Sequence, residues 1–211
     1  MRKIKILLVE DDPGWKETVS YFLDREPDLF LVGAAQTKED AVSLVRMLDI
    51  DVVLINAMLN GTGTDSLEAA LEINSIKPIK MMMVTFTDQK QLALEAFANG
   101  VINFIVKAHE EEIPAAIRAV YGNRSSIHFV AAGIIRQEFV RLKRLELQKS
   151  LTAMETSILR FIYGGHTQSE IMSTLHITES TVKKHVNKVI KKLGTQTSRE
   201  AARKASMKGI L

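Results

Sequence analysis

Short apolar runs alternate with helical patterns along residues 1–121. The runs are almost uniformly apolar, which predicts strands that are buried on both faces of a parallel sheet. Between them, apolar residues recur three or four positions apart, as in amphipathic helices. The expected strands are Ile4–Val9, Leu29–Ala35, Val52–Ile55, Met81–Val84 and Val101–Val106. Five strand and helix pairs in this order predict an α/β fold of the (βα)5, flavodoxin-like kind.

The helices expected after these strands each have one apolar face. Gly100 ends the fourth of them. The run of three methionines in the fourth strand is interpreted as sheet core rather than as a set of metal ligands. The helical stretches run through Trp15–Leu23, Ala41–Leu48, Ser66–Ile76, Asp88–Asn99 and Glu110–Tyr121.

The pattern changes after Tyr121. Residues 122–126 are a polar break, and Gly133–Ser150 is a basic stretch with Ile135, Phe139 and Leu142 on one helical side. This predicts a linker helix, which either packs on one of two domains or contributes to a dimer. The expected boundaries are therefore a first domain over 1–121, a linker over 122–150 and a second domain over 151–211.

Four compact helical units follow the linker. Three of them begin with a capping box, in which a threonine and a glutamate three residues later satisfy the exposed amides of a helix start. Gly164, Gly165 and Gly194 mark helix ends. The pattern predicts an all-α domain of four helices. The capping boxes are Thr152–Glu155, Thr167–Glu170 and Thr197–Glu200.

The third unit, "TESTVKKHVNKVIKKLG", is strongly basic. Apolar residues spaced four, three and four positions apart, from Val182 to Leu193, form a stripe toward the domain core. Five lysines and Asn187 are assigned to the other side of the helix. A capped helix and a short turn at His176–Ile177 precede this unit, which is typical of a helix-turn-helix with its second helix in the DNA major groove.

Composition and charge support two domains with different partners. A chain of 211 residues with 46% hydrophobic content can bury more than one core. Residues 1–121 hold 12 Lys and Arg against 19 Asp and Glu, a net charge of −7, whereas the other 90 residues hold 16 against 6, a net charge of +10. Such an asymmetry favours nucleic acid or another anionic surface as a partner of the basic half, although a basic helical domain can also simply be solvated.

The chain has no cysteine, which excludes disulfides and thiolate metal sites and fits a reducing cytoplasm. The apolar run Ile6–Val9 is too short for a signal peptide or a membrane span. We therefore expect a cytoplasmic protein without a membrane partner.

Polar residues follow the expected strands where the chain leaves the sheet. In an open parallel sheet, ligands bind beyond the carboxyl ends of the strands. Two carboxylates can hold a hard divalent cation, a hydroxyl can bond a phosphoryl oxygen, and an ammonium can neutralise its charge. The pattern therefore predicts a phosphoryl-binding pocket that lacks only a nucleophile. Its members are Glu10, Asp11, Asn56, Thr85 and Lys107.

Residues 1–121 resemble the receiver domain of bacterial two-component response regulators. The motifs are "LLVEDDP", "INAMLNG" in the place of the usual D-x-M-L-P-G, "VTFTD" and "NFIVK". The resemblance implies that Glu10 and Asp11 are Mg²⁺ carboxylates, and that position 56 is the phosphoacceptor and a further metal ligand. It also implies that Thr85, Phe104 and Lys107 are the receiver switch residues, and that a sensor histidine kinase is a partner.

Asn56 departs from the family, which has aspartate there. An amide is neutral and a poor nucleophile, so phosphorylation at residue 56 is not expected, and Mg²⁺ should be held more weakly. Either the natural receiver is degenerate, or aspartate was replaced by asparagine. Asn60, in the place of the family's proline, and the loop "GTGT" after it favour a natural departure.

Residues 151–211 are similar to the LuxR/NarL type of DNA-binding domain. The resemblance runs through Leu151–Thr152, Glu155, Glu170–Ile171, Ser180–Lys183 and His185–Val186; Lys184 and Asn187 are not fixed residues of the family. It implies base contacts from Lys183, Lys184 and Asn187. It also implies contacts to the DNA backbone around Thr167, Gln168, Ser169, Thr181, Lys188 and Lys191.

The sequence thus predicts a DNA-binding transcription regulator, and its resemblance to response regulators implies that it binds double-stranded DNA as a homodimer. The alternative within this class is a phosphorylation-independent regulator controlled by a small ligand or a partner protein at the receiver surface. An enzyme, such as a phosphotransferase, is disfavoured because Asn56 removes the nucleophile. An interaction scaffold is disfavoured by Lys183, Lys184 and Asn187.

Overall fold

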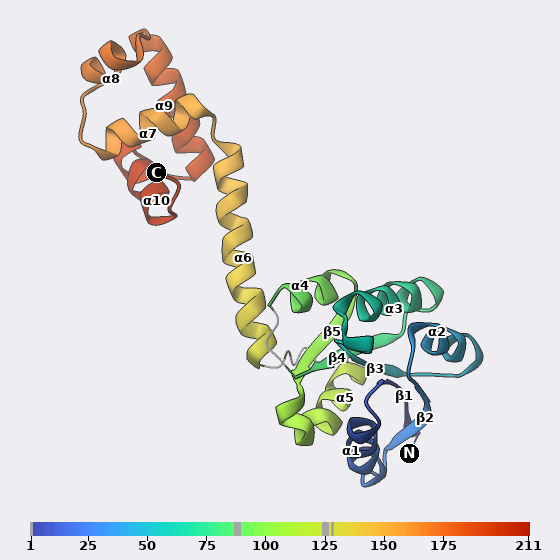
Figure 1. Cartoon of the computed structure of the whole chain (residues 1–211). Helices are drawn as coiled ribbons and strands as arrows, with labels where there is room; N and C mark the ends of the chain where they lie inside the picture. Colours follow the sequence, from blue (N-terminus) through green and yellow to red (C-terminus); the bar gives the residue numbers. More distant parts are fainter. Residues whose placement is uncertain (1, 87–89, 124–126, 128) are drawn as a thin grey trace. The chain divides into compact units, whose positions relative to one another are not determined.

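The computed structural model describes residues 2–86, 90–123, 127 and 129–211 (Figure 1). The chain divides into two compact units, Met1–Arg136 and Gln137–Leu211, each with cores of its own. Within the described residues, no helix is both long enough and apolar enough to cross a membrane.

The first unit is built on a five-stranded parallel sheet, as the sequence predicts. The strand order is β2-β1-β3-β4-β5. The third and fourth strands are longer than expected, so that Asn56 and Thr85 are themselves the last residues of strands. The strands are β1 Ile4–Val9, β2 Leu29–Ala35, β3 Val52–Asn56, β4 Lys80–Thr85 and β5 Val101–Val106.

Successive side chains of each strand alternate between two hydrophobic cores. One core packs under α2, α3 and α4, and the other under α1 and α5 (Figure 1). Met81 and Met83 lie in the first and Met82 in the second, all fully buried, which confirms that the methionine run is sheet core. The helices of this unit are α1 Pro13–Asp24, α2 Lys38–Met47, α3 Gly63–Ile76, α4 Lys90–Ala98 and α5 Ile113–Tyr121.

Two short 3-10 segments differ from the sequence expectation. η1, Leu59–Gly61, follows β3, and α3 already begins at Gly63, so most of the expected "GTGT" loop is helical. η2, Lys107–Glu112, precedes α5, which the sequence did not separate from it. Asp88, where the sequence predicts the start of the fourth helix, lies outside the described residues.

Helix α6, Phe129–Ser150, begins four residues before the predicted linker helix. Its first turns start earlier because Ala131 and Ile134 are buried in the core of the first unit. Its last turns belong to the second unit, where Leu147 packs against the core and Arg144 and Gln148 donate to the Gly209 carbonyl oxygen.

The second unit contains the four helices predicted from the sequence. All three capping boxes are present, each with the threonine side chain and the glutamate side chain bonded to backbone N–H groups. The core brings Leu159, Val189 and Ala205 together. The helices are α7 Ala153–Tyr163, α8 Gln168–Leu175, α9 Glu179–Leu193 and α10 Ser198–Met207.

A fragment that begins at Gln137 is expected to be more stable than one that begins at Leu151. Removal of the end of α6 deletes the packing of Leu147 and the hydrogen bonds to Gly209, a loss of about 1–2 kcal/mol. Both fragments should fold, because the four capped helices and their core are present in each. Urea unfolding followed by circular dichroism measures the difference; an unfolded 151–211 fragment would show that α6 is part of the minimal domain.

Candidate functional site

The predicted pocket residues lie together at one edge of the sheet. β1 and β3 are neighbours at the point where the strand order reverses, which is where ligands bind in folds of this class. Glu10 directly follows β1 and Asn56 ends β3, so the two side chains meet. Lys107 follows β5 and reaches the same point, with its Nζ 2.7 Å from Glu10 Oε2.

The side-chain amide of Asn56 lies at the centre of this pocket. Its Nδ2 donates to Glu10 Oε1 at 3.0 Å and to Asp11 Oδ1 at 2.7 Å. Its Oδ1 accepts from the Met58 N–H at 3.2 Å. The opposite amide orientation would place an oxygen against two carboxylates, so this orientation is the one that the charges favour. Asn56 therefore bridges the acidic pair with its two amide protons.

Glu10 and Lys107 form a buried ion pair beside the amide. Their side chains are exposed by 0% and 1%, respectively. Burial raises the pKa of Glu10 above its ordinary value, and the hydrogen bond from Lys107 opposes this rise. The Lys107 ammonium also lies 4.1 Å from the ring centroid of Trp15 and 4.5 Å from that of Phe86, so two aromatic rings flank it.

The second departure from the receiver motif is Asn60, in the place of the family's proline, and its backbone conformation explains it. Its backbone is left-handed, with φ of 53°, and its N–H donates to Asp11 Oδ2 at 3.0 Å. Proline fixes φ near −65° and has no N–H, so proline could make neither the conformation nor the bond. Asp11 thus has an amide donor on each oxygen, one from Asn56 and one from Asn60.

This donor set does not fit Mg²⁺ as it is arranged. Mg²⁺ requires oxygen ligands in near-octahedral geometry. The oxygens of Glu10 and Asp11 converge on a nitrogen of Asn56, whose own oxygen is bonded to Met58. The amide of Asn56 would have to turn over before these three residues could coordinate a cation.

The two other receiver positions are buried. Thr85 ends β4 and is fully buried, as is Phe104 in β5, which packs in the core under α2, α3 and α4.

Asn56 is also fixed through its backbone, because its carbonyl oxygen accepts from Ser66 Oγ at 2.7 Å. Ser66 Oγ in turn accepts from the Leu59 N–H, which connects α3 to the pocket loop.

The second unit contains a helix-turn-helix formed by α8 and α9. His176 closes α8 in a left-handed conformation, with φ of 52°, and Thr178 caps α9 by accepting from the Thr181 N–H. Ile171 of α8 and Val182 of α9 are buried together with Ile158 of α7. The turn and the packing therefore place α9 against the unit with one face outward.

The outward face of α9 is basic. Five of its predicted DNA-contacting residues are exposed: Lys183, Lys184, Asn187, Lys188 and Lys191. Lys183 also pairs with Glu179 at 2.6 Å, one turn earlier on the surface. Thr181 is half-buried, and its hydroxyl is bonded to that of Thr178.

Lys192 is exposed, as the sequence predicts, but it also contacts α7. Its Nζ lies 2.6 Å from Glu155 Oε2, and the Glu155 side chain is only 2% exposed. The lysine stem is long enough to bring the ammonium over the edge of the apolar stripe to α7. The contact with Glu155 therefore gives Lys192 a structural role, because it joins α9 to α7.

The remaining residues predicted to contact the DNA backbone lie at the start of α8. Gln168 and Ser169 are exposed in its first turn. Thr167 is engaged in the capping box, since its N–H and hydroxyl both bond the Glu170 carboxylate.

Sequence reasoning missed several residues of the pocket. Trp15 was assigned only to an apolar helix face, and Phe86 only to a motif, although both flank the ammonium of Lys107. The bond from the Asn60 N–H is a backbone contact and leaves no side-chain signal. The one signal that could have indicated a role for Phe86 was its position directly after Thr85 in the motif "VTFTD".

Comparisons with known proteins divide the chain into the same two domains. Residues 6–118 match the family model of the response regulator receiver domain, and residues 149–205 match that of the bacterial regulatory proteins of the luxR family. The response regulator protein VraR of Staphylococcus saprophyticus is 31% identical over 200 residues, 94% of each chain.

Two further similarities extend over almost the whole chain. The uncharacterized transcriptional regulatory protein YxjL of Bacillus subtilis is 28% identical over 215 residues, 99% of this chain and 98% of that one. A structure of the Salmonella typhimurium response regulator RcsB, described in connection with DNA interaction, matches with a TM-score of 0.59 at 16% identity, over 98% of this chain and 100% of that one. This last similarity shows the fold alone.

Proposed function

The chain belongs to the response regulators that join a receiver domain to a LuxR-type DNA-binding domain, and from this we propose how its two sites work. It is a DNA-binding transcription regulator. We propose that α9 contacts the bases of its operator and that the receiver, with asparagine at position 56, is not phosphorylated there. The comparisons do not favour the alternative of control by a small ligand or a partner protein.

The exposed lysine face of α9 is the observation that carries the DNA-binding proposal. Lys183, Lys184 and Asn187 would contact base edges, where lysine bonds guanine acceptors and asparagine pairs with adenine. Lys188 and Lys191 would contact phosphates. Gln168, Ser169 and Thr181 would fix the register on the DNA backbone, and Thr167 would act through the cap of α8.

The amide arrangement at Asn56 supports the proposal for the receiver. Asn56 supplies neither an anionic nucleophile nor a third carboxylate, and its protons satisfy Glu10 and Asp11. Receiver domains use Mg²⁺ in phosphorylation; we propose that in this chain the ion is bound weakly or not at all. No enzymatic step is therefore assigned to the pocket, and a sensor histidine kinase would have to act on a form with aspartate at this position.

Assembly and domain limits complete the proposal. A homodimer would place two α9 helices on half-sites one or more helical turns apart. The proposed limits are a receiver over 1–121, a linker over 122–150 and a DNA-binding domain over 151–211. Because its proposed partner is DNA, we propose that the protein acts in the cytoplasm.

Salt dependence tests the α9 assignment. We expect operator affinity to fall steeply between low and moderate salt, because each lysine-phosphate contact releases counterions. Lys191→Ala should weaken binding to all sequences and reduce the slope of log affinity against log salt by about 1. Lys184→Ala should cost about 1–3 kcal/mol on the preferred operator and change which base pairs are preferred.

Lys90→Ala is the matched control, because Lys90 is an exposed lysine of α4 in the receiver. It should leave affinity and slope unchanged. Fluorescence anisotropy with labelled duplexes over a salt series gives both quantities. If Lys184→Ala and Lys191→Ala both had the affinity and salt slope of the wild type, α9 would not be the recognition helix.

A further inference from the structure

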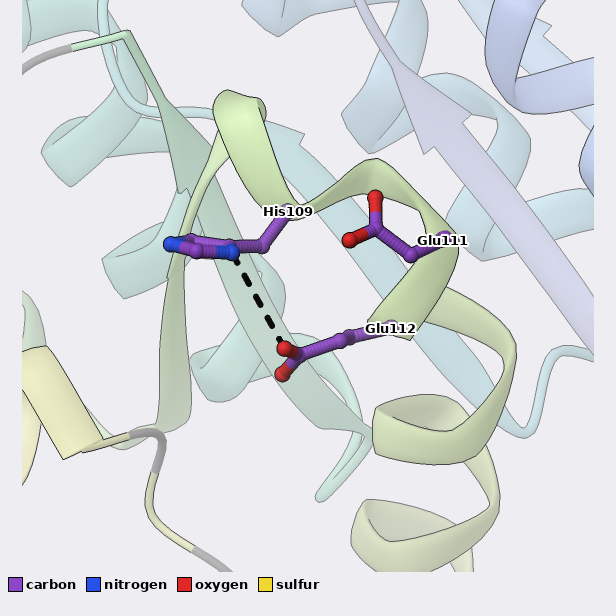
Figure 2. A group of neighbouring side chains, drawn as sticks. All are labelled: His109, Glu111 and Glu112. Carbon is purple, nitrogen blue, oxygen red and sulfur yellow. Dashed lines mark ion pairs between the residues drawn. The ribbon is translucent and has the colours of Figure 1, made fainter.

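A mixed group of metal-binding side chains lies on η2, outside the receiver pocket. His109, Glu111 and Glu112 each offer one ligand atom, and these atoms all lie within 4.8 Å of one another. Figure 2 shows the imidazole of His109 and the two carboxylates turned toward a common space. An imidazole with two carboxylates is a donor set that Zn²⁺ and similar transition ions accept, whereas Mg²⁺ and Ca²⁺ prefer oxygen alone.

The acidic residue Glu112 stands at the start of α5. Glu112 is the N-cap residue of α5, but its side chain makes no capping hydrogen bond, and Pro114 in the first turn has no N–H to donate. Glu112 Oε1 lies 3.8 Å from His109 Nδ1, which is an ion pair when the imidazole is protonated (Figure 2). That distance is too long for a hydrogen bond. It is short enough for both atoms to coordinate one ion at about 2.0–2.1 Å.

The imidazole is held in place by its surroundings. His109 leaves the helical conformation within η2, with φ of −117° and ψ of 41°, and this turn separates it from the preceding residues. Its ring packs edge-on against Phe129, with 5.5 Å between the ring centroids. A ligand whose ring is already positioned loses less conformational entropy when it binds.

We propose that His109, Glu111 and Glu112 bind one Zn²⁺ ion or a similar divalent transition ion, with water completing the coordination. The site is independent of Asn56 and of the DNA-contacting face, so it stands or fails separately from the proposed function. A bound ion would join η2 to the start of α5. Through the ring of His109 it would also fix the contact with Phe129, the first residue of α6.

The test uses the full-length chain without a histidine tag. Zn²⁺ is titrated in competition with a chromophoric chelator, and Co²⁺ is used as a probe because its visible absorption reports inner-sphere coordination. We expect one ion per chain, and a loss of affinity of about 10- to 100-fold or more in His109→Gln and in Glu111→Gln, since loss of outer-shell partners alone has effects of that size.

Two matched variants control for nonspecific binding. Glu110→Gln removes an acid of the same segment that is outside the donor set. His166→Gln removes a histidine that faces Glu170 at 3.7 Å in the other unit, where the described residues offer no third ligand. Neither should change the affinity. The proposal is overturned by absence of binding, by unchanged affinity in His109→Gln, or by Ca²⁺ competing equally with Zn²⁺, which would indicate only an acidic surface.

Discussion

Asn56→Asp is expected to create a Mg²⁺-dependent phosphoacceptor in a chain that is otherwise inert toward small phosphodonors. The replacement removes the two amide protons that now satisfy Glu10 and Asp11, and it places three carboxylates around one point. Three carboxylates repel one another unless a cation binds, and a bound cation offsets repulsion between the nucleophile and the donor. Lys107 lies close enough to pair with the new phosphoryl group.

Intact-protein mass after incubation with a small phosphodonor and Mg²⁺, with and without chelator, measures the effect. A phosphate-sized adduct is expected on Asn56→Asp alone. The double variant Asn56→Asp with Asp11→Asn is the matched control, because it keeps the charge of the pocket but removes one metal ligand. No adduct on Asn56→Asp would mean that Asn60 and the aromatic rings beside Lys107 have also disabled the pocket. An adduct on the unchanged chain would place the acceptor elsewhere.

Glu155→Ala is expected to destabilise the DNA-binding unit by about 2–4 kcal/mol, the range for breaking a buried ion pair with one partly exposed partner. Glu155 is 1% exposed and accepts from the Thr152 N–H and from Lys192 Nζ. Its removal leaves the ammonium without its partner and the start of α7 without half of its capping box. A loss of this size is a large share of the stability of a small domain, so operator binding should fall with it.

Glu200→Ala is the control for the capping contribution, because Glu200 caps α10 at an exposed site and forms no ion pair with a lysine in the described part of the chain. It should cost only about 1 kcal/mol. Urea unfolding of both variants separates the two effects. Equal losses would show that the Lys192 bond contributes nothing beyond the cap.

Acid should weaken the same unit. Burial raises the pKa of Glu155, but the hydrogen bonds from Lys192 and from the Thr152 N–H outweigh burial and hold this pKa below its ordinary value of 4.5. A depressed carboxyl pKa contributes stability that is complete above 4.5 and is lost as the pH falls through the folded-state pKa. Glu155→Gln should therefore have a flatter stability profile below pH 4.5 than the wild type.

The elements that the sequence predicted well depend on local rules. The capping boxes were confirmed because Thr152 and Glu155 are three residues apart, and such a spacing fixes their contact. The pocket residues that follow strands came together because parallel strands end at one edge of a sheet. Thus Glu10, Asn56 and Lys107 could be grouped from the order of strands and polar residues alone.

The features that the sequence did not predict depend on distant contacts or on backbone conformation. Lys192 is exposed, but its ammonium bonds to Glu155, which lies 37 residues earlier in the chain. The hydrogen bond from the Asn60 N–H to Asp11 requires a left-handed backbone conformation at residue 60. Asparagine tolerates this conformation, but an asparagine in a sequence does not predict it. The early start of α6 at Phe129 follows from burial of Ala131 and Ile134 in a core formed by other helices.

The single tryptophan of the chain gives the receiver pocket a built-in optical probe. Trp15 is the only indole among 211 residues, and its ring centroid lies 4.1 Å from the Lys107 ammonium. Indole emission depends on the charges next to the ring, so movement of this ammonium toward a new anion changes the fluorescence without any label. Because the DNA-binding half has no tryptophan, the same emission follows the receiver alone while operator DNA is bound.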